Sequence, residues 1–342
     1  MREMKALLKK IAPKFLIQAK RDFDECCRCL LASVSVAKEL SKETGIPYWV
    51  LLLDMSLSAL SCVAPHEYRM YRFHEKSRSA RNRFLTSHRM RYLIQAFNRG
   101  DLALMKDKHL FNRHFSDFIG RQWLYAPDAS DQQIEVFFDA QRQVIVKPSS
   151  LSGGSGVRKI TCSELADIKA FCESARKDCL LLEECIKQHP DINSISSASV
   201  NTLRITTVVD RAGVPHILCA GLRMGRGENI TDNLSGGGII AQIDLDSGII
   251  FTLAIGADLQ TYIKHPTSGA VLPGFQIPHW EATKKMILHA AQMVPQVRWV
   301  AWDVAITAKE PLLIEGNASL PAPRAMQIAI QTGFYHLLRS YL

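Results

Sequence analysis

The pattern of apolar residues changes near residue 98 of this 342-residue chain, and this change limits the folds that the chain can adopt. Before it, apolar residues recur at helical spacing, chiefly over 4–19, 23–40 and 92–97. After it, short β-branched and aliphatic runs alternate with helical segments. We therefore expect a mostly helical region over residues 1–97, followed by a mixed α+β part with largely antiparallel strands.

Within the α+β part, the individual elements can be placed by their periodicity. Turns such as Arg211–Ala212–Gly213 join consecutive strands into hairpins. The runs predicted as strands are 143–148, 179–186, 201–210, 215–225, 237–251, 299–306 and 310–317. The segments predicted as helices are 163–175, 281–293 and 325–338.

One segment, VIVKPSSLSGGSGVRKI over residues 144–160, joins a short strand to a flexible loop. Lys147 stands at the end of the strand, and Pro148 closes it. The glycines and serines that follow supply backbone N–H groups and tolerate positive φ, so the loop can wrap an anion. The segment is not a Walker loop, because the lysine precedes the glycines, and no helix opens from the last glycine as in a dinucleotide-binding loop. A polar hairpin loop with an exposed lysine is the alternative interpretation.

Composition excludes several protein classes. An apolar content of 47% with 22% charged residues is that of an ordinary globular chain of two or three domains or lobes. Nine cysteines without paired zinc spacing favour reduced thiols and a cytoplasmic protein. No secretory signal is evident, and the longest apolar stretch, YWVLLL at 48–53, is too short to span a bilayer.

Positive charge is concentrated between Arg69 and Arg121 in a chain of net charge +9. The basic residues of this stretch include Arg72, Lys76, Arg78, Arg81, Arg83, Arg89, Arg91, Arg99, Lys106, Lys108 and Arg113. They would attract a phosphorylated substrate, an acidic glycan, nucleic acid or an anionic lipid surface, unless they form a solvated helix face. The interleaved aromatic residues have spacings that suit helix packing, which argues against a dedicated nucleic-acid surface.

A candidate metal site lies near the C-terminus, in WVAWDVAITAKEPLLIEGN. Asp303 lies within an apolar strand, and Glu315 and Asn317 point from one face of the next strand. A buried lone carboxylate is costly without a cation or donors, so Asp303 argues against a simple strand end with solvated acids. Three hard oxygen donors of this kind suit Mg²⁺.

Taken in order, these features resemble the dispersed signature of the ATP-grasp superfamily. The chain shows a first lysine, a second lysine with a glycine loop, an acidic segment LLLEECI, arginine-bearing strands and finally Asp followed by Glu-x-Asn. Segments such as DNLSGGGIIAQIDLDSGII and WDVAITAKEPLLIEGN look like the sugar-transfer-associated members, from about Tyr71 to near the C-terminus. The resemblance implies an ATP-grasp fold with a helical region at 1–97, an N-terminal lobe at 98–182 and a C-terminal lobe at 183–342.

The resemblance also implies where ATP binds. Lys108 and Lys147 would grip the phosphates. The backbone of Glu184 and Cys185 would read the adenine edge, and Ile186 would pack on the ring. Either Glu183 or Asp191 would meet the adenine amine or the ribose hydroxyls. The residues of the mobile loop over the phosphates would be Ser152, Gly153, Gly154, Ser155 and Gly156.

The function implied is that of an ATP-dependent carboxylate–amine ligase working through an acyl-phosphate, in polysaccharide or secondary-metabolite biosynthesis. As in the α-L-glutamate ligase branch, Arg204, Arg223 and Asn233 would serve the transferred phosphoryl group and the acyl-phosphate. ATP and Mg²⁺ would be required, and the partners would be a small carboxylate and an amine, one of them acidic or phosphorylated. An ATP-grasp kinase acting on a hydroxyl, or a non-catalytic nucleotide- or polyanion-binding protein, are the alternatives.

Overall fold

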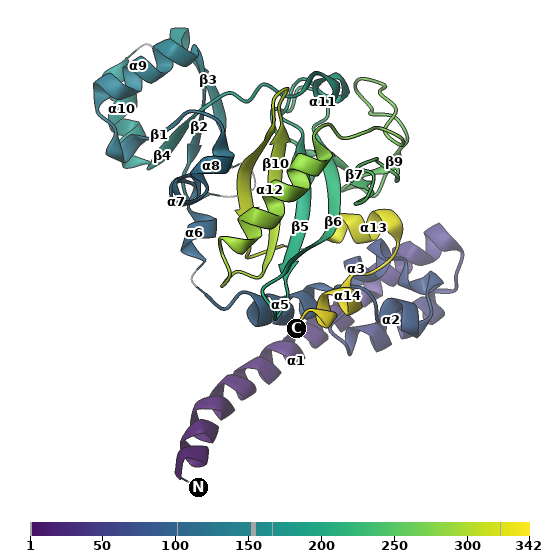
Figure 1. Cartoon of the computed structure of the whole chain (residues 1–342). Helices are drawn as coiled ribbons and strands as arrows, with labels where there is room; N and C mark the ends of the chain where they lie inside the picture. Colours follow the sequence, from purple (N-terminus) through teal and green to yellow (C-terminus); the bar gives the residue numbers. More distant parts are fainter. Residues whose placement is uncertain (1, 101, 152–154, 166, 322) are drawn as a thin grey trace. The chain divides into compact units, whose positions relative to one another are not determined.

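The computed structural model describes residues 2–100, 102–151, 155–165, 167–321 and 323–342, with side chains from residue 18 onward. The chain forms two compact units. The first contains Met1–Leu93 and Gln331–His336, and the second contains Ile94–Ile330 and Leu337–Leu342. Figure 1 labels most helices and strands of both units. The division at residues 97 and 182 expected from the sequence stays a prediction.

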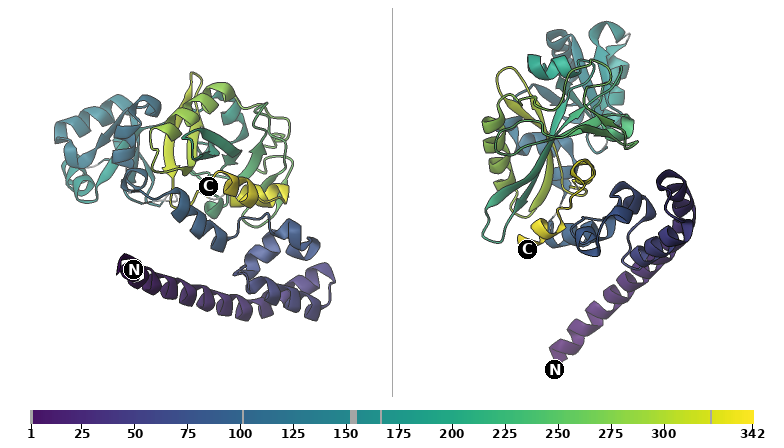
Figure 2. Two further views of the ribbon diagram at one scale, coloured as in Figure 1. Left: turned by 60° about the horizontal axis from the view of Figure 1, so that its bottom comes forward. Right: turned by 90° about the vertical axis from the view of Figure 1, so that its right-hand side faces the viewer.

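The first unit is helical, as the sequence predicts. Its helices are α1 (Arg2–Thr44), α2 (Tyr48–Ala59), α3 (Pro65–Met70), η1 (Phe73–Glu75), α4 (Arg78–Arg81) and the first part of α5 (Ser87–Phe97). The two helical segments expected before residue 40 are one continuous helix, which both views of Figure 2 show. The residues between those segments contain no glycine or proline to break it, and α1 ends just before Gly45, whose φ is +72°.

Aromatic side chains form the core of the first unit. Tyr68, Tyr71, Phe73 and Phe84 are all buried. The ring centroids of Tyr71 and Phe84 lie 4.8 Å apart, and those of Phe73 and Phe84 lie 5.3 Å apart. The prediction that the interleaved aromatic residues serve helix packing is confirmed for Tyr71, Phe73 and Phe84, whereas Tyr92 is exposed.

The basic residues around them are paired within the same unit. Arg81 forms two bonds to the carboxylate of Asp54 on α2, at 2.6 and 2.7 Å. Arg69 pairs with Glu39 and Glu43 of α1. The stretch was expected to be a field of positive charge with few acids, but helices distant in sequence supply its carboxylates. Part of this charge is therefore neutralised inside the helical unit.

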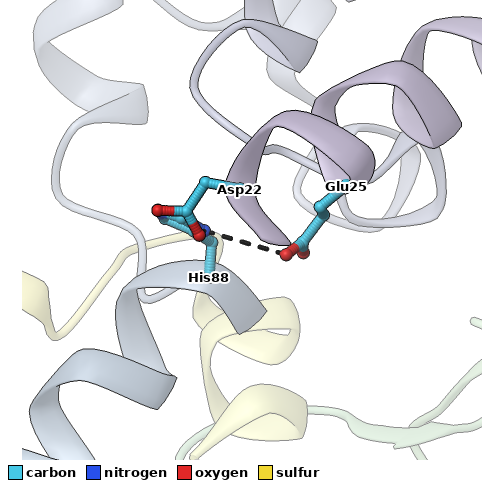
Figure 3. A group of neighbouring side chains, drawn as sticks. All are labelled: Asp22, Glu25 and His88. Carbon is cyan, nitrogen blue, oxygen red and sulfur yellow. Dashed lines mark ion pairs between the residues drawn. The ribbon is translucent and has the colours of Figure 1, made fainter. Parts of the chain in front are cut away.

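One group in the first unit has the composition of a metal site. Asp22 and Glu25 on α1 and His88 on α5 bring their ligand-type atoms within 4.8 Å of one another (Figure 3). Arg91 bonds to Glu25, and its Nη2 lies 3.3 Å from His88 Nδ1. Tyr92 donates to Asp22 at 2.5 Å. The guanidinium of Arg91 already supplies the positive charge that a metal ion would bring to these carboxylates. We therefore interpret this group as an ion-pair cluster that holds α5 on α1.

The second unit contains two antiparallel sheets. The smaller has the order β1-β4-β2-β3, and the larger has the order β11-β10-β5-β6-β7-β8-β9. The strands are β1 (Trp123–Tyr125), β2 (Gln143–Pro148), β3 (Arg158–Thr161), β4 (Leu180–Glu184), β5 (Thr202–Val209), β6 (Pro215–Met224), β7 (Ile239–Ile243), β8 (Ala254–Gly256), β9 (Thr261–Tyr262), β10 (Trp299–Ile306) and β11 (Pro311–Asn317). The helices are α6 (Ala103–Lys106), α7 (Lys108–His114), α8 (Ser116–Ile119), η2 (Ala126–Asp128), α9 (Asp131–Gln141), η3 (Cys162–Glu164), α10 (Ile168–Lys177), α11 (Pro190–Ile195), η4 (Leu234–Gly236), α12 (Trp280–Gln292), α13 (Arg324–Ile330) and the last part of α14 (Tyr335–Ser340).

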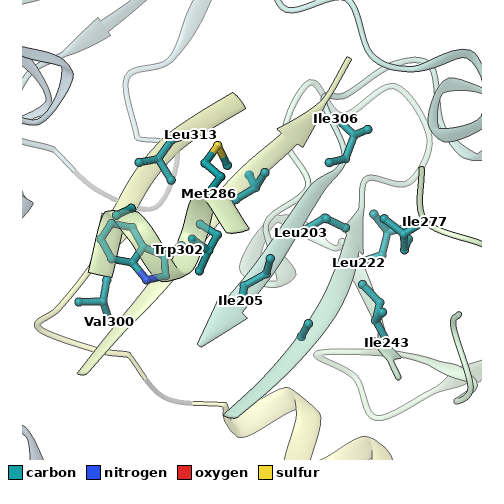
Figure 4. Packing of buried hydrophobic residues seen from close by; sticks show 14 of the residues in the cluster. Leu203, Ile205, Leu222, Ile243, Ile277, Met286, Val300, Trp302, Ile306 and Leu313 are labelled. Carbon is teal, nitrogen blue, oxygen red and sulfur yellow. The ribbon is translucent and has the colours of Figure 1, made fainter. Parts of the chain in front are cut away.

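Each sheet is apolar on one face. In the large sheet, alternate residues such as Leu203, Leu222 and Trp302 belong to one buried cluster that includes Met286 of α12 (Figure 4). In the small sheet, α9 and α10 cover the corresponding face, which includes Val144. The residues between these positions point to the opposite faces, and there the strands carry lysines, arginines and carboxylates.

A β-bulge interrupts the register of β10 and β11. Val304 pairs with Leu313, whereas Asp303 pairs with Glu315, so Ile314 is an extra residue in β11. Without it, Leu313 and Glu315 would lie on the same face. The bulge keeps Leu313 in the apolar core and turns Glu315 to the face that carries Asp303.

Three elements differ from the sequence prediction. The expected helix over 325–338 is two helices, α13 and α14: the chain at Gly333 lies against the backbone of Arg83, and the N–H of Tyr335 donates to the Arg83 carbonyl at 2.8 Å instead of continuing the helix. The helix expected from 163 begins at Ile168, after the short turn η3. The strand expected over 237–251 stops at Ile243, where a turn follows in which Ser247 bonds to Asp244.

Among the described residues, no helix has the length and apolarity that crossing a membrane requires.

Asn98 fixes the start of the second unit to the large sheet, and its removal should cost stability. Its buried amide donates to the carbonyls of Trp299 and Ala318 at 2.8 and 2.9 Å and accepts from Trp299 N–H at 2.9 Å. Asn98→Ala leaves these groups without partners and should lower the free energy of unfolding by about 3 kcal/mol, measured by denaturant titration. The exposed Asn193→Ala is the control and should change it by less than about 0.5 kcal/mol. Equal effects of the two substitutions would contradict this role.

Candidate functional site

A pocket lies between the polar faces of the two sheets of the second unit. The small sheet and its loop contribute Ile145, Lys147, Leu151, Ser155, Val157, Glu183, Glu184 and Ile186. The large sheet and its loops contribute Val200, Thr202, Arg223, Ile230, Thr231, Asp232, Asn233, Asp303, Ile314 and Glu315, and Lys108 adds a further cation. Most of the residues predicted from distant parts of the sequence therefore line one pocket.

Lys147 is held in place by a buried carboxylate. Its Nζ lies 2.7 Å from Glu183 Oε2, and the two side chains are 8% and 5% exposed. Glu183 Oε1 accepts from Arg121 at 2.9 Å and from Asn112 at 3.0 Å. Burial alone would raise the pKa of Glu183, but the charges of Arg121 and Lys147 outweigh it and hold that pKa well below its usual value.

This network changes the interpretation of Glu183. The resemblance left open whether Glu183 or Asp191 would contact adenine or ribose, but both oxygens of Glu183 are already bonded inside the protein. Asp191 is exposed near the start of α11, 3.6 Å from His189, and it does not line the pocket. Neither carboxylate is therefore placed as a free acceptor for the nucleotide. Arg121 and Asn112 were missed, because nothing in the local sequence connects them to Lys147.

Lys108 lies beside the start of the glycine loop, near the end of β2 that carries Lys147. Its ammonium donates to the carbonyl of Leu151 and approaches that of Pro148 at 3.5 Å. Burial lowers the pKa of Lys108; the carboxylate of Glu315 opposes this shift, and the charge of Lys147 adds to it. The two predicted lysines thus interact electrostatically. Of the loop, Ser155 lines the pocket and Gly156 has φ of +74°, whereas Ser152, Gly153 and Gly154 lie outside the described residues.

The segment after β4 is only partly placed as expected. Glu184 and Ile186 line the pocket, but Cys185 does not, and its thiol lies 3.4 Å from the carbonyl of Gln143. The backbone N–H of Glu184 donates to the carbonyl of Gln122 at 2.9 Å. That N–H is therefore engaged within the protein and is not free to read an adenine edge.

Asp303 is the centre of charge in the large sheet. It pairs across β10 and β5 with Arg204, whose Nε lies 2.6 Å from Oδ1 and whose Nη2 donates to Oδ2 at 3.1 Å. Arg223 on β6 donates to the same Oδ2 at 3.0 Å. The two arginines predicted to serve the phosphoryl group therefore share one carboxylate, which was itself predicted as a metal ligand.

Arg223 also takes part in a second hydrogen-bond network. Its Nη2 lies 3.0 Å from Asp232 Oδ1 and also donates to Asn233. Asp232 in turn accepts from Thr202 N–H at 2.9 Å and from the Thr202 hydroxyl. Burial opposes the charge on Arg223, but Asp303 and Asp232 together raise its pKa. From the sequence alone, Asp232 was assigned no role, although its place beside Asn233 and before a glycine run was an available signal.

Glu315 and Asn317 lie on β11, next to Asp303 of the neighbouring strand β10. Asn317 donates to Glu315 Oε1 at 3.1 Å. Burial raises the pKa of Glu315, and the neighbouring negative charge of Asp303 raises it further. Asp303 Oδ1 has no hydrogen-bond donor with suitable geometry among the described residues, although Arg204 is close. Two crowded carboxylates, one incompletely satisfied oxygen and a neighbouring amide form a donor set that fits a hard divalent cation.

Two antiparallel sheets that enclose a pocket of this kind, with lysines on one side and acidic residues on the other, form the ATP-grasp fold. The chain belongs to the sugar-transfer associated ATP-grasp family, which matches residues 87–341. No curated protein matches the sequence.

Several solved structures are similar in fold at low sequence identity. The ATP-grasp ligase PsnB, complexed with minimal precursor, Mg and ADP, has 15% identity and a TM-score of 0.45, over 72% of this chain and 60% of that one. The D-alanyl-alanine synthetase A from Vibrio cholerae has 15% identity and a TM-score of 0.41, over 70% of this chain and 64% of that one. The chain thus spans about three-fifths of the length of the PsnB chain.

The pairing of Glu183 predicts a dependence of stability on pH. Unfolded chains protonate this group near the ordinary value of 4.5, whereas the folded protein keeps it ionised to much lower pH. Its contribution is therefore complete above pH 4.5 and is lost as the pH falls below that value. Glu183→Gln leaves Lys147 and Arg121 without their buried counter-charge, and should lower the free energy of unfolding by about 3–5 kcal/mol near neutral pH.

This difference between wild type and Glu183→Gln should shrink as the pH is lowered through the acidic range, measured by urea unfolding at a series of pH values. The exposed Glu173→Gln is the matched control and should show no such difference. A wild-type advantage that stays constant into acid would mean that the network does not depend on the charge of Glu183.

Proposed function

We propose that the chain is an ATP-dependent ligase that joins a carboxylate to an amine through an acyl-phosphate. The observation that carries this proposal is the pocket in which Lys108 and Lys147 face Arg223, Asp303 and Glu315 from the other sheet. Family membership supports ATP as the co-substrate. Arginines beside the acidic group support transfer of a phosphoryl group to a carboxylate, because guanidinium forks match both anions.

On the nucleotide side, the residues of the small sheet would bind phosphates. Lys147 points into the pocket with its position set by Glu183, so little side-chain entropy is lost when it meets a phosphate. Lys108 is tethered to carbonyls of the glycine loop, and its binding to a phosphate would be coupled to the position of that loop. Ile186 would pack against the base.

On the acidic side, Glu315, Asn317 and Asp303 Oδ1 would hold Mg²⁺. When bound, Mg²⁺ would offset the charge that builds on the β- and γ-phosphates during transfer. The ion would also relieve the repulsion between Glu315 and Asp303, which raises the pKa of Glu315 in its absence. Asp303 would in addition orient the two arginines, to which it is already bonded.

The chemistry would run in two steps. A carboxylate oxygen of the acid attacks the γ-phosphorus of ATP; the new O–P bond forms as the bond to the β-phosphate oxygen breaks, and ADP leaves. The amine nitrogen then attacks the acyl carbon, the C–N bond forms, inorganic phosphate leaves with the C–O electron pair, and the amine loses a proton. Arg204 Nη1, which has no hydrogen bond among the described residues, would donate to the transferring phosphoryl group.

The substrates would be small molecules, an amino acid or sugar acid and an amine. Part of the basic stretch between Arg69 and Arg113 would recruit an acidic or phosphorylated acceptor, through those cations that lack carboxylate partners within the described residues, such as Arg78 and Arg113.

ADP release measured over a panel of acids, with and without amines, tests this function. We expect turnover that requires both compounds, a product joined by an amide bond, and a hydroxamate when hydroxylamine replaces the amine. Lys147→Ala should abolish the signal and weaken ATP binding by about tenfold or more in calorimetry, because one buried phosphate-binding charge is lost. The exposed Lys309→Ala is the matched control.

Two outcomes of that screen would contradict the ligase proposal. ADP release that depends on a hydroxyl compound and yields a phosphate ester would identify a kinase. ATP binding without turnover for any pair of compounds would favour a non-catalytic binding protein.

The metal site predicts a separate effect of Glu315→Gln. The substitution keeps the side-chain volume but removes a charged ligand, and should lower Mg²⁺-dependent turnover by more than about 100-fold, since even outer partners of metal ligands contribute 10- to 100-fold. Mn²⁺ binding, followed by electron paramagnetic resonance, should weaken in parallel, while the melting temperature should not fall, because Glu315 and Asp303 repel each other. Glu310→Gln, exposed on the same hairpin, is the control. Unchanged Mn²⁺ binding would rule out this ligand.

A further inference from the structure

A second hollow, of about 730 Å³, lies in the second unit, next to the hairpin that joins β5 to β6. Its lining includes Arg99, Arg211, Arg298, Pro295 and Gln296. A neighbouring hollow shares Arg211, Pro295 and Arg298 with it. It has no lining residue in common with the proposed nucleotide pocket. Arg298 immediately precedes β10, whereas Asp303 lies in the middle of that strand, so the two sites are separated along the sheet.

The three arginines of this hollow are not neutralised by the protein. None of them forms an ion pair with a carboxylate within the described parts of the chain. Asp210 is adjacent to Arg211, but its carboxylate accepts from His216 at 2.9 Å and from the N–H groups of Ala212 and Val214. Burial lowers the pKa of Arg298, Asp210 opposes this shift, and the charges of Arg211 and Arg99 lower it further. All three arginines line the same hollow, so their positive charges act on one small volume.

One of the three arginines, Arg298, is fixed in place by hydrogen bonds to the backbone. Arg298 donates from Nε to the carbonyl of Val209 and from Nη2 to that of Tyr341, both at 2.8 Å, and it lies 5.1 Å from the ring centroid of Phe97. These bonds leave Nη1 free of partners among the described residues. Arg99 follows Asn98, whose buried amide is bonded to β10. A Cβ at Gly100 would come within 2.7 Å of Gln296, so this wall is closely packed.

We propose that this hollow binds the phosphate or pyrophosphate group of a small ligand, at a site separate from the nucleotide pocket. Three guanidinium groups carry more charge than one carboxylate can neutralise, and their planar forks match phosphate oxygens. The cations are gathered in one concave site and not spread along a stripe, which favours a compact ligand over a nucleic acid or a membrane surface. A bound polyanion removes the repulsion among the arginines, which supplies part of the binding free energy.

Calorimetric titration of the full chain with inorganic pyrophosphate, in metal-free buffer, tests this site. The double variant Arg99→Gln with Arg211→Gln removes two exposed members and leaves the structural bonds of Arg298 intact. We expect its pyrophosphate affinity to fall by about tenfold or more relative to wild type. A charge-matched control, Lys177→Gln with Lys309→Gln, removes two exposed cations elsewhere in the same unit and should stay within about twofold of wild type.

The Lys147→Ala variant separates this site from the nucleotide pocket. Pyrophosphate binding that depends on Arg99 and Arg211 should persist in it, whereas binding lost only in Lys147→Ala would assign pyrophosphate to the nucleotide pocket and overturn the proposal. Equal affinities of the two double variants would also overturn it. So would a wild-type chain that binds anionic lipid vesicles or a nucleic acid through these arginines but does not bind pyrophosphate.

Discussion

The buried carboxylate of Asp303 is the interaction on which the rest of the site depends. A lone charge in an apolar strand is costly to bury, and here two guanidinium groups from neighbouring strands, Arg204 and Arg223, offset that cost. The same strand turns Trp302 and Val304 toward α12, so one strand supplies both the apolar core and the centre of charge. Removing Asp303 would leave two buried or half-buried arginines facing each other, and the polar face of the large sheet would lose its order.

The small sheet repeats this arrangement, with a buried carboxylate between two cations. There a buried carboxylate, Glu183, is surrounded by Lys147 and Arg121, and Arg121 also donates to the carbonyl of Leu313 on β11 of the large sheet at 2.9 Å. The cation that faces the pocket is therefore oriented before any ligand arrives, and so are the arginines on the other side. Groups that are fixed in advance lose little freedom on binding and need little reorganisation as charge develops. Both sheets thus use a buried counter-charge to hold a functional one.

The periodicity of apolar residues predicted most helices and strands. It failed where contacts with residues distant in sequence determine the structure. The strands over 143–148 and 201–210 were correctly predicted because alternate apolar residues must face one core. The helix expected over 325–338 was wrong, because Gly333 meets the backbone of Arg83, a contact that no local pattern reports. The basic stretch shows the same limit. Its charge was evident from the sequence, but its partners Asp54, Glu39 and Glu43 lie on helices far from it in sequence.

The sequence by itself determined the two lysines, the order of the motifs, the acidic pair with its amide, and the α+β class, because each depends on residue type and short-range spacing. The tertiary structure alone decided which charges meet. Sequence spacing puts Glu315 and Asn317 on one face, but only the bulge at Ile314 turns that face toward Asp303 while Leu313 stays in the core. Only the packing of α7 and β4 shows that Glu183 serves Lys147 and not a ligand. Charged groups interact strongly only within a few ångströms of each other. For residues far apart in sequence, these short distances arise only when the core packs.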